Sequence, residues 1–232
     1  MRPIPFLSLA VLLFLCISTS AVFGQDEDKN QYMSEVQGQS LLYRGKIEKH
    51  YSFKYRGTYF AYQEDFVVGQ VYYNRKLYTG VLLNLNAQND QLLVRQSNTH
   101  LPVVLDKTLV DWFVLGDKRF AKIEEGGEIG LTGGYYEVFI DGKYQVLKKI
   151  TKEYREELVA SGQDSRIDKV FGEVTDYYIR HNGEYVRITG KSTFVKIFKE
   201  YKKDINRVYR DATRAVRSDK DVLYRKVMEA VR

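Results

Sequence analysis

Six lysines and arginines near the C-terminus recur at helical spacing. They follow one another at steps of four, four, three, four and three, and they are Lys199, Lys203, Arg207, Arg210, Arg214 and Arg217. On one α-helix this spacing places all six on one face. Clustered cations attract anions, so this face is a candidate anion- or partner-binding site for phosphates of lipopolysaccharide, an acidic protein surface or nucleic acid. The alternative is a solvated helix face that Glu200, Asp204 and Asp211 balance in part.

The basic charge of the chain is concentrated in the same segment. Residues 191–232 contain 13 Lys and Arg against 6 Asp and Glu, a net charge of +7. The whole chain of 232 residues carries only +6. The excess positive charge therefore lies in this segment, which we predict to be a basic C-terminal helical region that packs on a sheet.

Side chains that bind metals or carry out acid–base chemistry are sparse. The histidines are His50, His100 and His181, and none has a second ligand at the spacing of a zinc motif. Lys191 with its neighbours Gly190 and Ser192 is similar to the end of a phosphate loop, but the first glycine of that motif is missing. The sequence has no G-x-S-x-G elbow. We therefore predict no catalytic residue, metal or cofactor, and a protein that is not an enzyme.

Tyrosine pairs form a second candidate surface. The pairs Tyr72-Tyr73, Tyr135-Tyr136 and Tyr177-Tyr178 each place one ring on either side of a strand. A row of exposed rings would suit a sugar-stacking platform, or part of a cleft for a lipid or peptide. The alternative is core packing on one face of the sheet and cross-strand pairs on the other.

The N-terminus is typical of a secretory signal peptide. Arg2 precedes an apolar core at residues 4–17, and small or polar residues lead to Gly24. We expect residues 1–24 to be removed and residues 25–40, which are acidic and polar, to form a flexible leader. The apolar run is shorter than the roughly 20 residues of a membrane anchor, so we expect no transmembrane span after cleavage.

The single cysteine bears on the compartment. Cys16 lies inside the predicted signal peptide, so the mature chain would contain no disulfide. A lipoprotein would be acylated at Cys16, but Leu15 stands where that signal requires a small residue. A disulfide-free exported chain of this size is typical of the bacterial periplasm. We predict an exported protein of the periplasm or the outer-membrane surface, and nucleic acid is then the least favoured ligand.

Alternating apolar residues and turn dipeptides predict a β-rich region across residues 41–190. Residues 67–96 have the pattern of a β-meander. Further hairpins are expected at Gly116-Asp117, Asp141-Gly142 and Asn182-Gly183, because such dipeptides supply the positive φ of primed turns.

The remaining segments carry weaker or different patterns. Two more strands are expected across residues 51–62, and a short helix is expected across residues 152–168. After Gly190 the apolar period becomes 3.6, which predicts a long amphipathic helix followed by a second helix that starts near Ser218. The residues that define the first helix are Phe194, Phe198, Tyr201, Ile205 and Val208.

The order of these motifs resembles that of a family of exported proteins from Bacteroidota for which no activity is established. The matching stretches begin with GTYFAYQEDFVVGQVYYNRKLYTGVLLNLNAQNDQLLV at residues 57–94 and LVDWFVLGDKRF at residues 109–120. They continue with GYYEVFIDGKYQVLKK at 134–149, DYYIRHNGEYVRITGKSTFVKIF at 176–198 and YKKDINRVYRDATRAV at 201–216. The resemblance implies bacterial export, and it brings no cofactor or catalytic residue.

Together these patterns predict an α+β fold, with a curved antiparallel β-meander or incomplete barrel and C-terminal amphipathic helices. The function we predict is that of a non-catalytic exported envelope protein, a binding or accessory module for a partner protein or envelope ligand. The alternative is a carrier of a small hydrophobic ligand, or a hydrolase, with a pocket in the curved sheet. The sequence leaves the ligand and the oligomeric state open.

Overall fold

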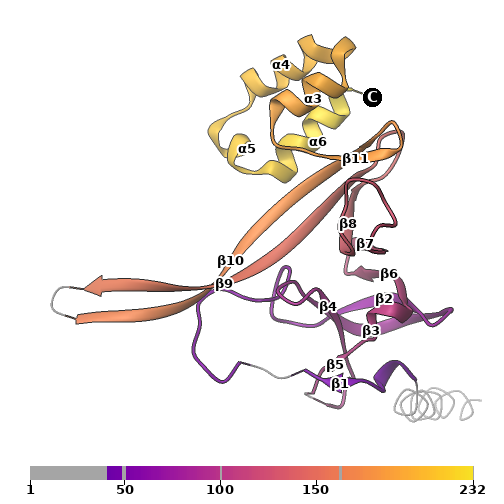
Figure 1. The fold of residues 1–232 in the computed structure, drawn as a ribbon, viewed down its shortest axis with the longest axis vertical. Coiled ribbons are helices and arrows are strands. Elements are labelled where there is room, and N and C mark those ends of the chain that lie inside the picture. The colour runs from indigo at the N-terminus through magenta and orange to yellow at the C-terminus, as the bar shows by residue number, and fades with distance from the viewer. Residues whose placement is uncertain (1–40, 49–50, 100, 162–163, 232) are drawn as a thin grey trace, which may run out of the picture. The chain divides into compact units, whose positions relative to one another are not determined.

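A computed structural model describes four stretches of the chain (Figure 1), which are residues 41–48, 51–99, 101–161 and 164–231. The predicted signal peptide at 1–24 and the predicted leader at 25–40 lie outside these residues. His50 and His100 lie outside them as well.

The chain divides into two units, residues 1–44 and residues 45–232. The described part of the first unit is the 3₁₀-helix η1 (Leu41–Tyr43) with Arg44, whose backbone N–H donates to the carbonyl of Leu41 at 3.2 Å. All other described elements belong to the second unit, which combines strands and helices.

The second unit is built on one sheet of eleven described strands in the order β1-β5-β4-β3-β2-β6-β7-β8-β9-β10-β11. Every pair of neighbouring strands is antiparallel, and the sheet is curved and unclosed (Figure 1), so the predicted fold class is confirmed. The strands are β1 (Lys46–Ile47), β2 (Val67–Tyr73), β3 (Lys76–Asn86), β4 (Gln91–Arg95), β5 (Val103–Val104), β6 (Val110–Leu115), β7 (Lys118–Ile123), β8 (Gly134–Ile140), β9 (Val146–Ser161), β10 (Asp164–His181) and β11 (Glu184–Arg187).

The curvature has a local cause. The register shifts between Gly69 and Gln70 where β2 meets β3, and between Tyr72 and Tyr73 where β2 meets β6. Such bulges bend a strand and increase its twist. The predicted meander is confirmed as β2, β3 and β4, and the turn between β2 and β3 has positive φ at Asn74 and Arg75.

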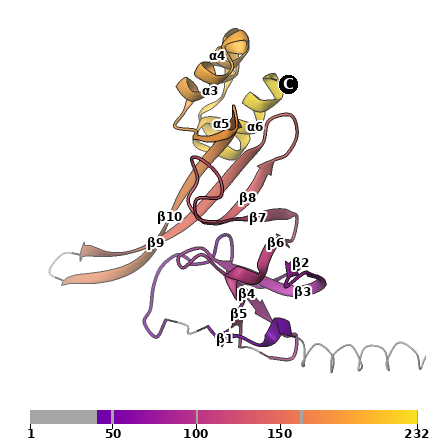
Figure 2. The ribbon, with the colours of Figure 1, turned by 45° about the vertical axis from the view of Figure 1, so that its right-hand side comes forward.

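The prediction of a short helix across residues 152–168 is wrong. Residues 152–161 belong to β9 and residues 164–168 to β10, and the two strands pair continuously from Asp164 with Ser161 to Ile179 with Val146. In Figures 1 and 2 these two long strands run from beside the helices to a point beyond the neighbouring strands. Tyr154 and Leu158 are four residues apart, which is close to one turn of a helix and equal to two repeats of a strand. That spacing therefore could not separate the two structures.

The two strands expected across residues 51–62 are also wrong. This segment is irregular and touches the ladder only through isolated bridges of Arg56 with Val170 and of Phe60 with Asn86. Its rings form a cluster instead, in which Tyr59 lies 5.6 Å from Phe171 of β10 between ring centroids. Aromatic alternation here reflects packing onto β10, because each ring finds an edge-to-face partner.

The C-terminal segment folds into short helices rather than one long helix. They are α3 (Lys191–Ile197), α4 (Lys202–Asp211), α5 (Arg214–Ser218) and α6 (Lys220–Ala230), and the 3₁₀-helix η3 (Lys199–Tyr201) lies between α3 and α4. Another 3₁₀-helix, η2 (Lys107–Leu109), precedes β6. Helix α6 is capped by Asp219, whose Oδ1 accepts the N–H of Val222 at 3.1 Å, and not by Ser218 as expected.

The helices pack on one end of the sheet, as the amphipathic pattern predicts (Figure 2). Phe194, Phe198 and Ile205 are fully buried or nearly so. They join one apolar cluster with the sheet residues Phe139, Tyr177 and Ile179, with Ile188 directly after β11, and with Leu223, Val227 and Met228 of α6. Among the described residues, no helix has the length and apolar character needed to cross a membrane.

Candidate functional site

The six cations of the predicted stripe do not lie on one helix. All six are exposed, with Lys199 in η3, three on α4 and two on α5. The expectation of one continuous basic face is therefore wrong. Lys203, Arg207 and Arg210 keep the helical spacing of α4, whereas Arg214 and Arg217 turn with α5.

Two breaks in the chain cause this change. Phe198 ends α3 with φ −110° and ψ 64°, and its ring is buried in the apolar cluster. Ala212 ends α4 in an extended conformation, and the Thr213 hydroxyl then accepts the N–H of Val216 at 3.4 Å to begin α5. Because the chain turns at Ala212, Arg217 folds back, and its Nη2 donates to the carbonyl oxygen of Arg210 at 3.1 Å.

The fold-back brings three cations around one hollow of about 480 Å³. We call this hollow the basic pocket, and it is lined by Lys191, Asn206, Tyr209, Arg210 and Arg217. Arg210 and Arg217 belong to the predicted stripe. Lys191 comes from the first turn of α3, and sequence reasoning set it aside with the failed phosphate-loop pattern.

The electrostatics of the basic pocket favour an anion. No Asp or Glu is among the described residues that line it. Arg210 forms an exposed ion pair at 3.0 Å with Asp211, while Arg217 donates to a neutral carbonyl. Lys191 and Arg217 form no ion pair with any residue that the structure describes. Among these residues, two of the three cations thus have no counter-charge.

Tyr209 also lines the basic pocket, and its ring packs against the apolar cluster. Burial raises the pKa of Tyr209, so its hydroxyl stays neutral at ordinary pH. Within the described stretches this buried hydroxyl has no hydrogen-bond partner. The side-chain amide of Asn206, which lines the pocket, offers hydrogen-bond donors that complement positive charge at an anion site.

The other stripe cations have different surroundings. Arg207 pairs with Asp204 at 2.8 Å on the surface of α4. Lys199, Lys203 and Arg214 are exposed, form no ion pair within the described part of the chain and do not line the basic pocket. The structure therefore divides the predicted site into two pocket arginines and four surface cations.

A second polar cluster joins the sheet to α6. The ammonium of Lys148 on β9 lies 2.7 Å from Oδ2 of Asp221 and 3.8 Å from Oε2 of Glu137. Tyr62 donates a hydrogen bond to Glu137, and Tyr177 donates one to Asp221. These charges and hydroxyls satisfy one another, so the cluster holds α6 against the hairpin. Sequence reasoning missed it because its members are scattered along the chain and no local pattern relates them.

The tyrosine pairs do not form a row of exposed rings. Tyr73, Tyr135, Tyr136 and Tyr177 are buried, and Tyr72 and Tyr178 are half-buried. Tyr72 stacks on Trp112 of the neighbouring strand with ring centroids 6.0 Å apart. These positions agree with core packing and cross-strand pairing.

Among the described residues, no group of three or more His, Cys, Asp or Glu is arranged to hold a metal ion. His181 lies at the end of β10, where it pairs in register with Glu184 of β11.

Comparison with known proteins finds no match. No family model matches the chain, and neither the characterised proteins nor the solved structures contain a match.

Proposed function

We propose that this chain is a non-catalytic exported envelope protein that binds an anionic envelope component through the basic pocket. The observation that carries the proposal is the convergence of Lys191, Arg210 and Arg217 on one hollow that no described acidic side chain lines. Clustered cations of this kind raise the local concentration of anions and speed their capture.

A phosphate group is the anion that best suits this set of side chains. The planar guanidinium of arginine binds phosphate through two parallel hydrogen bonds, while lysine contributes a mobile point charge. Arg210 and Arg217 supply the first kind of contact, and Lys191 supplies the second. The hollow is open enough for a phosphate that remains attached to a larger molecule, such as a lipid headgroup.

The packing of the helices supports a preformed site. Phe198 and Ile205 lie between Lys191 and Asn206 in the chain, and both are anchored in the apolar cluster. Asp221 ties α6 to β9 through Lys148. Binding to a site that is already ordered avoids the entropy cost of ordering it. The signal-peptide pattern of residues 1–24 supports the envelope as the place where the ligand is met.

Cross-linking with mass spectrometry on native envelopes tests this function. The pocket variant carries Lys191→Gln, Arg210→Gln and Arg217→Gln. The matched control carries Lys199→Gln, Lys203→Gln and Arg214→Gln, which remove the same charge outside the pocket. We expect the wild type and the control to share specific cross-links that the pocket variant loses. Identical cross-links in all three proteins would contradict the proposal.

The alternative function, a carrier of a small hydrophobic ligand or a hydrolase, stays a prediction. It needs an apolar pocket inside the curved sheet. The hollow that involves apolar β8 and α6 residues, Ile140 and Met228, measures about 240 Å³. It lies at the hairpin turn between β8 and β9, with Asp141 and Lys143 at its wall.

A further inference from the structure

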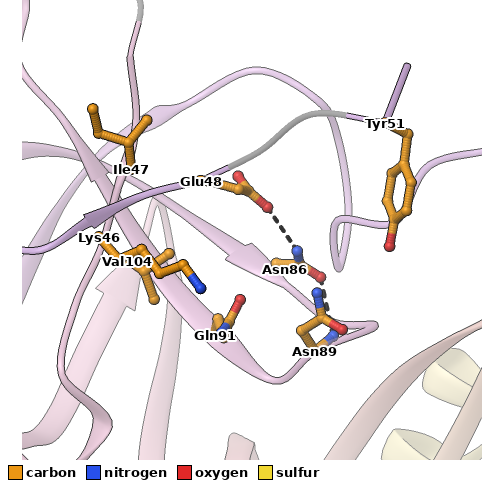
Figure 3. Close-up of a pocket in the computed structure, with 8 residues that line it drawn as sticks. All are labelled: Lys46, Ile47, Glu48, Tyr51, Asn86, Asn89, Gln91 and Val104. Carbon is orange, nitrogen blue, oxygen red and sulfur yellow. Dashed lines mark hydrogen bonds between the residues drawn. The ribbon is translucent and has the colours of Figure 1, made fainter. Parts of the chain in front are cut away.

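A second hollow lies at the β1 edge of the sheet and differs in chemistry from the basic pocket. Its volume is about 200 Å³, and residues of β1, β3, β4 and β5 line it (Figure 3). We call it the amide pocket, because its polar wall consists mainly of Asn86, Asn89 and Gln91. Glu48 and Lys46 complete that wall.

The polar wall is held in place by buried contacts. Asn86 is 1% exposed and Glu48 is 9% exposed. The Nδ2 of Asn86 donates to Oε1 of Glu48 at 2.7 Å, and its Oδ1 accepts the backbone N–H groups of Gln88 and Asn89, both at 3.1 Å. Asn86 therefore connects the turn that carries Asn89 to Glu48, the residue directly after β1.

Several hydrogen-bonding groups of this wall have no partner among the described residues. The side-chain amides of Asn89 and Gln91 and the ammonium of Lys46 have no hydrogen-bond partner in the stretches that the structure describes. Figure 3 shows Lys46, Gln91 and Asn89 along one side of the hollow, with Tyr51 at its far end. A primary amide offers two donors and one acceptor, so it can both give to and accept from a hydroxyl group.

Apolar surface also lines the pocket, and its charges cancel. Val104 pairs in register with Lys46, so its aliphatic side chain lies on the same face as that lysine. Lys46 and Glu48 bring one positive and one negative charge, so the site has no net preference for an ion. Drug-sized ligands fill roughly 300–1,000 Å³, which means that this smaller hollow takes a single compact ring.

From these features we propose that the amide pocket binds one residue of a neutral sugar. The hydroxyl groups of a pyranose are donors and acceptors at once and match Asn89 and Gln91. The C–H face of the ring matches the aliphatic side chain of Val104. This site is separate from the basic pocket and does not depend on the function proposed for it.

Ligand-observed nuclear magnetic resonance on the full chain tests this proposal. The probes are D-glucose, D-galactose and N-acetyl-D-glucosamine, with glycine as a zwitterion of small size. The test variant is Asn89→Ala with Gln91→Ala. The matched control is Gln96→Ala with Asn98→Ala, which removes the same two amide types at the same spacing, beyond β4 and outside the pocket.

We expect the wild type and the control to bind at least one of the three sugars, and the test variant to bind it about tenfold more weakly, because two hydrogen bonds are lost. The pocket variant Lys191→Gln, Arg210→Gln, Arg217→Gln should bind the sugar like the wild type. Binding of glycine but no sugar, binding of none of the probes, or equal weakening in the test variant and the control would each overturn the proposal. A far-ultraviolet circular dichroism spectrum that matches the wild type confirms that the variant is folded.

Discussion

The ammonium of Lys148 lies 2.7 Å from Oδ2 of Asp221 and joins strand β9 to the first turn of α6. Lys148 is buried, and Glu137 beside it is buried as well. A carboxylate in the first turn of a helix is stabilised by the helix dipole, so Asp221 suits this place in two ways. The pair fastens α6 to the sheet, and α6 shares one apolar cluster with α3 and α4.

Replacing Lys148 by Met should destabilise the protein strongly. The change leaves Glu137 and Asp221 close together without their cation, and breaking a buried ion pair costs about 3 kcal/mol or more. Urea denaturation measures the loss in the free energy of unfolding. The control is Lys118→Met, whose partner Asp117 is almost fully exposed, and it should cost less than about 1 kcal/mol. Equal losses in the two variants would show that Lys148 is not a fastening residue.

Alkaline pH should weaken the fold through its buried tyrosines. Burial raises the pKa of Tyr135, and burial together with the hydrogen bond to Asp221 raises the pKa of Tyr177. In the unfolded chain these hydroxyls ionise near pH 10, at about their reference value. Above that pH the folded state holds more protons than the unfolded state, so the free energy of unfolding falls as pH rises.

Urea denaturation at pH 9 and pH 11 checks this effect. Burial lowers the pKa of Lys149. As pH approaches the pKa of a free lysine, the unfolded state then holds more protons at Lys149 than the folded state. This effect raises the free energy of unfolding with pH and opposes the effect of the tyrosines. Comparison with Tyr177→Phe isolates the tyrosine, because this variant keeps Lys149. We predict a smaller fall in stability for Tyr177→Phe than for the wild type. A steeper fall in the variant would contradict the assignment.

Gly69 should tolerate no side chain. A Cβ at this position of β2 would lie 2.1 Å from the carbonyl oxygen of Val114 on β6. Moving the backbone of β6 to relieve this contact would disturb its pairing in the sheet. Gly69→Ala should therefore lower the free energy of unfolding by about 2 kcal/mol or more. Gly127→Ala, where the closest contact is the carbonyl oxygen of Glu124 at 3.2 Å in a loop, should cost much less. Thermal unfolding of the two variants ranks them, and the reverse order would refute the argument.

The parts of the fold that the sequence predicts are those with local causes. The hairpin of β10 and β11 turns at Asn182 and Gly183, with φ of 52° and 86°, and this dipeptide signals such a turn by itself. The pattern around Leu158 predicts a helix, but this segment is part of β9. Its strand structure depends on pairing with β10, where Ile167 lies opposite Leu158, and no local pattern signals that pairing. Long-range pairing decides such segments.

The candidate site was predictable only in part for the same reason. The spacing of Arg210 and Arg217 predicts one face of a single helix. The two arginines lie on α4 and α5 instead, and both line the basic pocket. Their approach to Lys191 requires the turn at Ala212, which has no glycine or proline to announce it. The amide pocket was not predictable, because Glu48 meets Asn86 only when β1 joins the far edge of the sheet.

Equilibrium binding to lipid vesicles tests the central claim most directly. The purified full chain is titrated with vesicles of equal parts phosphatidylglycerol and phosphatidylcholine at low salt, in three forms: the wild type, the pocket variant at Lys191, Arg210 and Arg217, and the control variant at Lys199, Lys203 and Arg214. If the basic pocket holds phosphate, the pocket variant should bind at least about tenfold more weakly than the wild type, and the control should change by no more than about threefold. Equal weakening in both variants would mean that the vesicles respond to diffuse surface charge, and it would contradict a pocket formed by Lys191, Arg210 and Arg217.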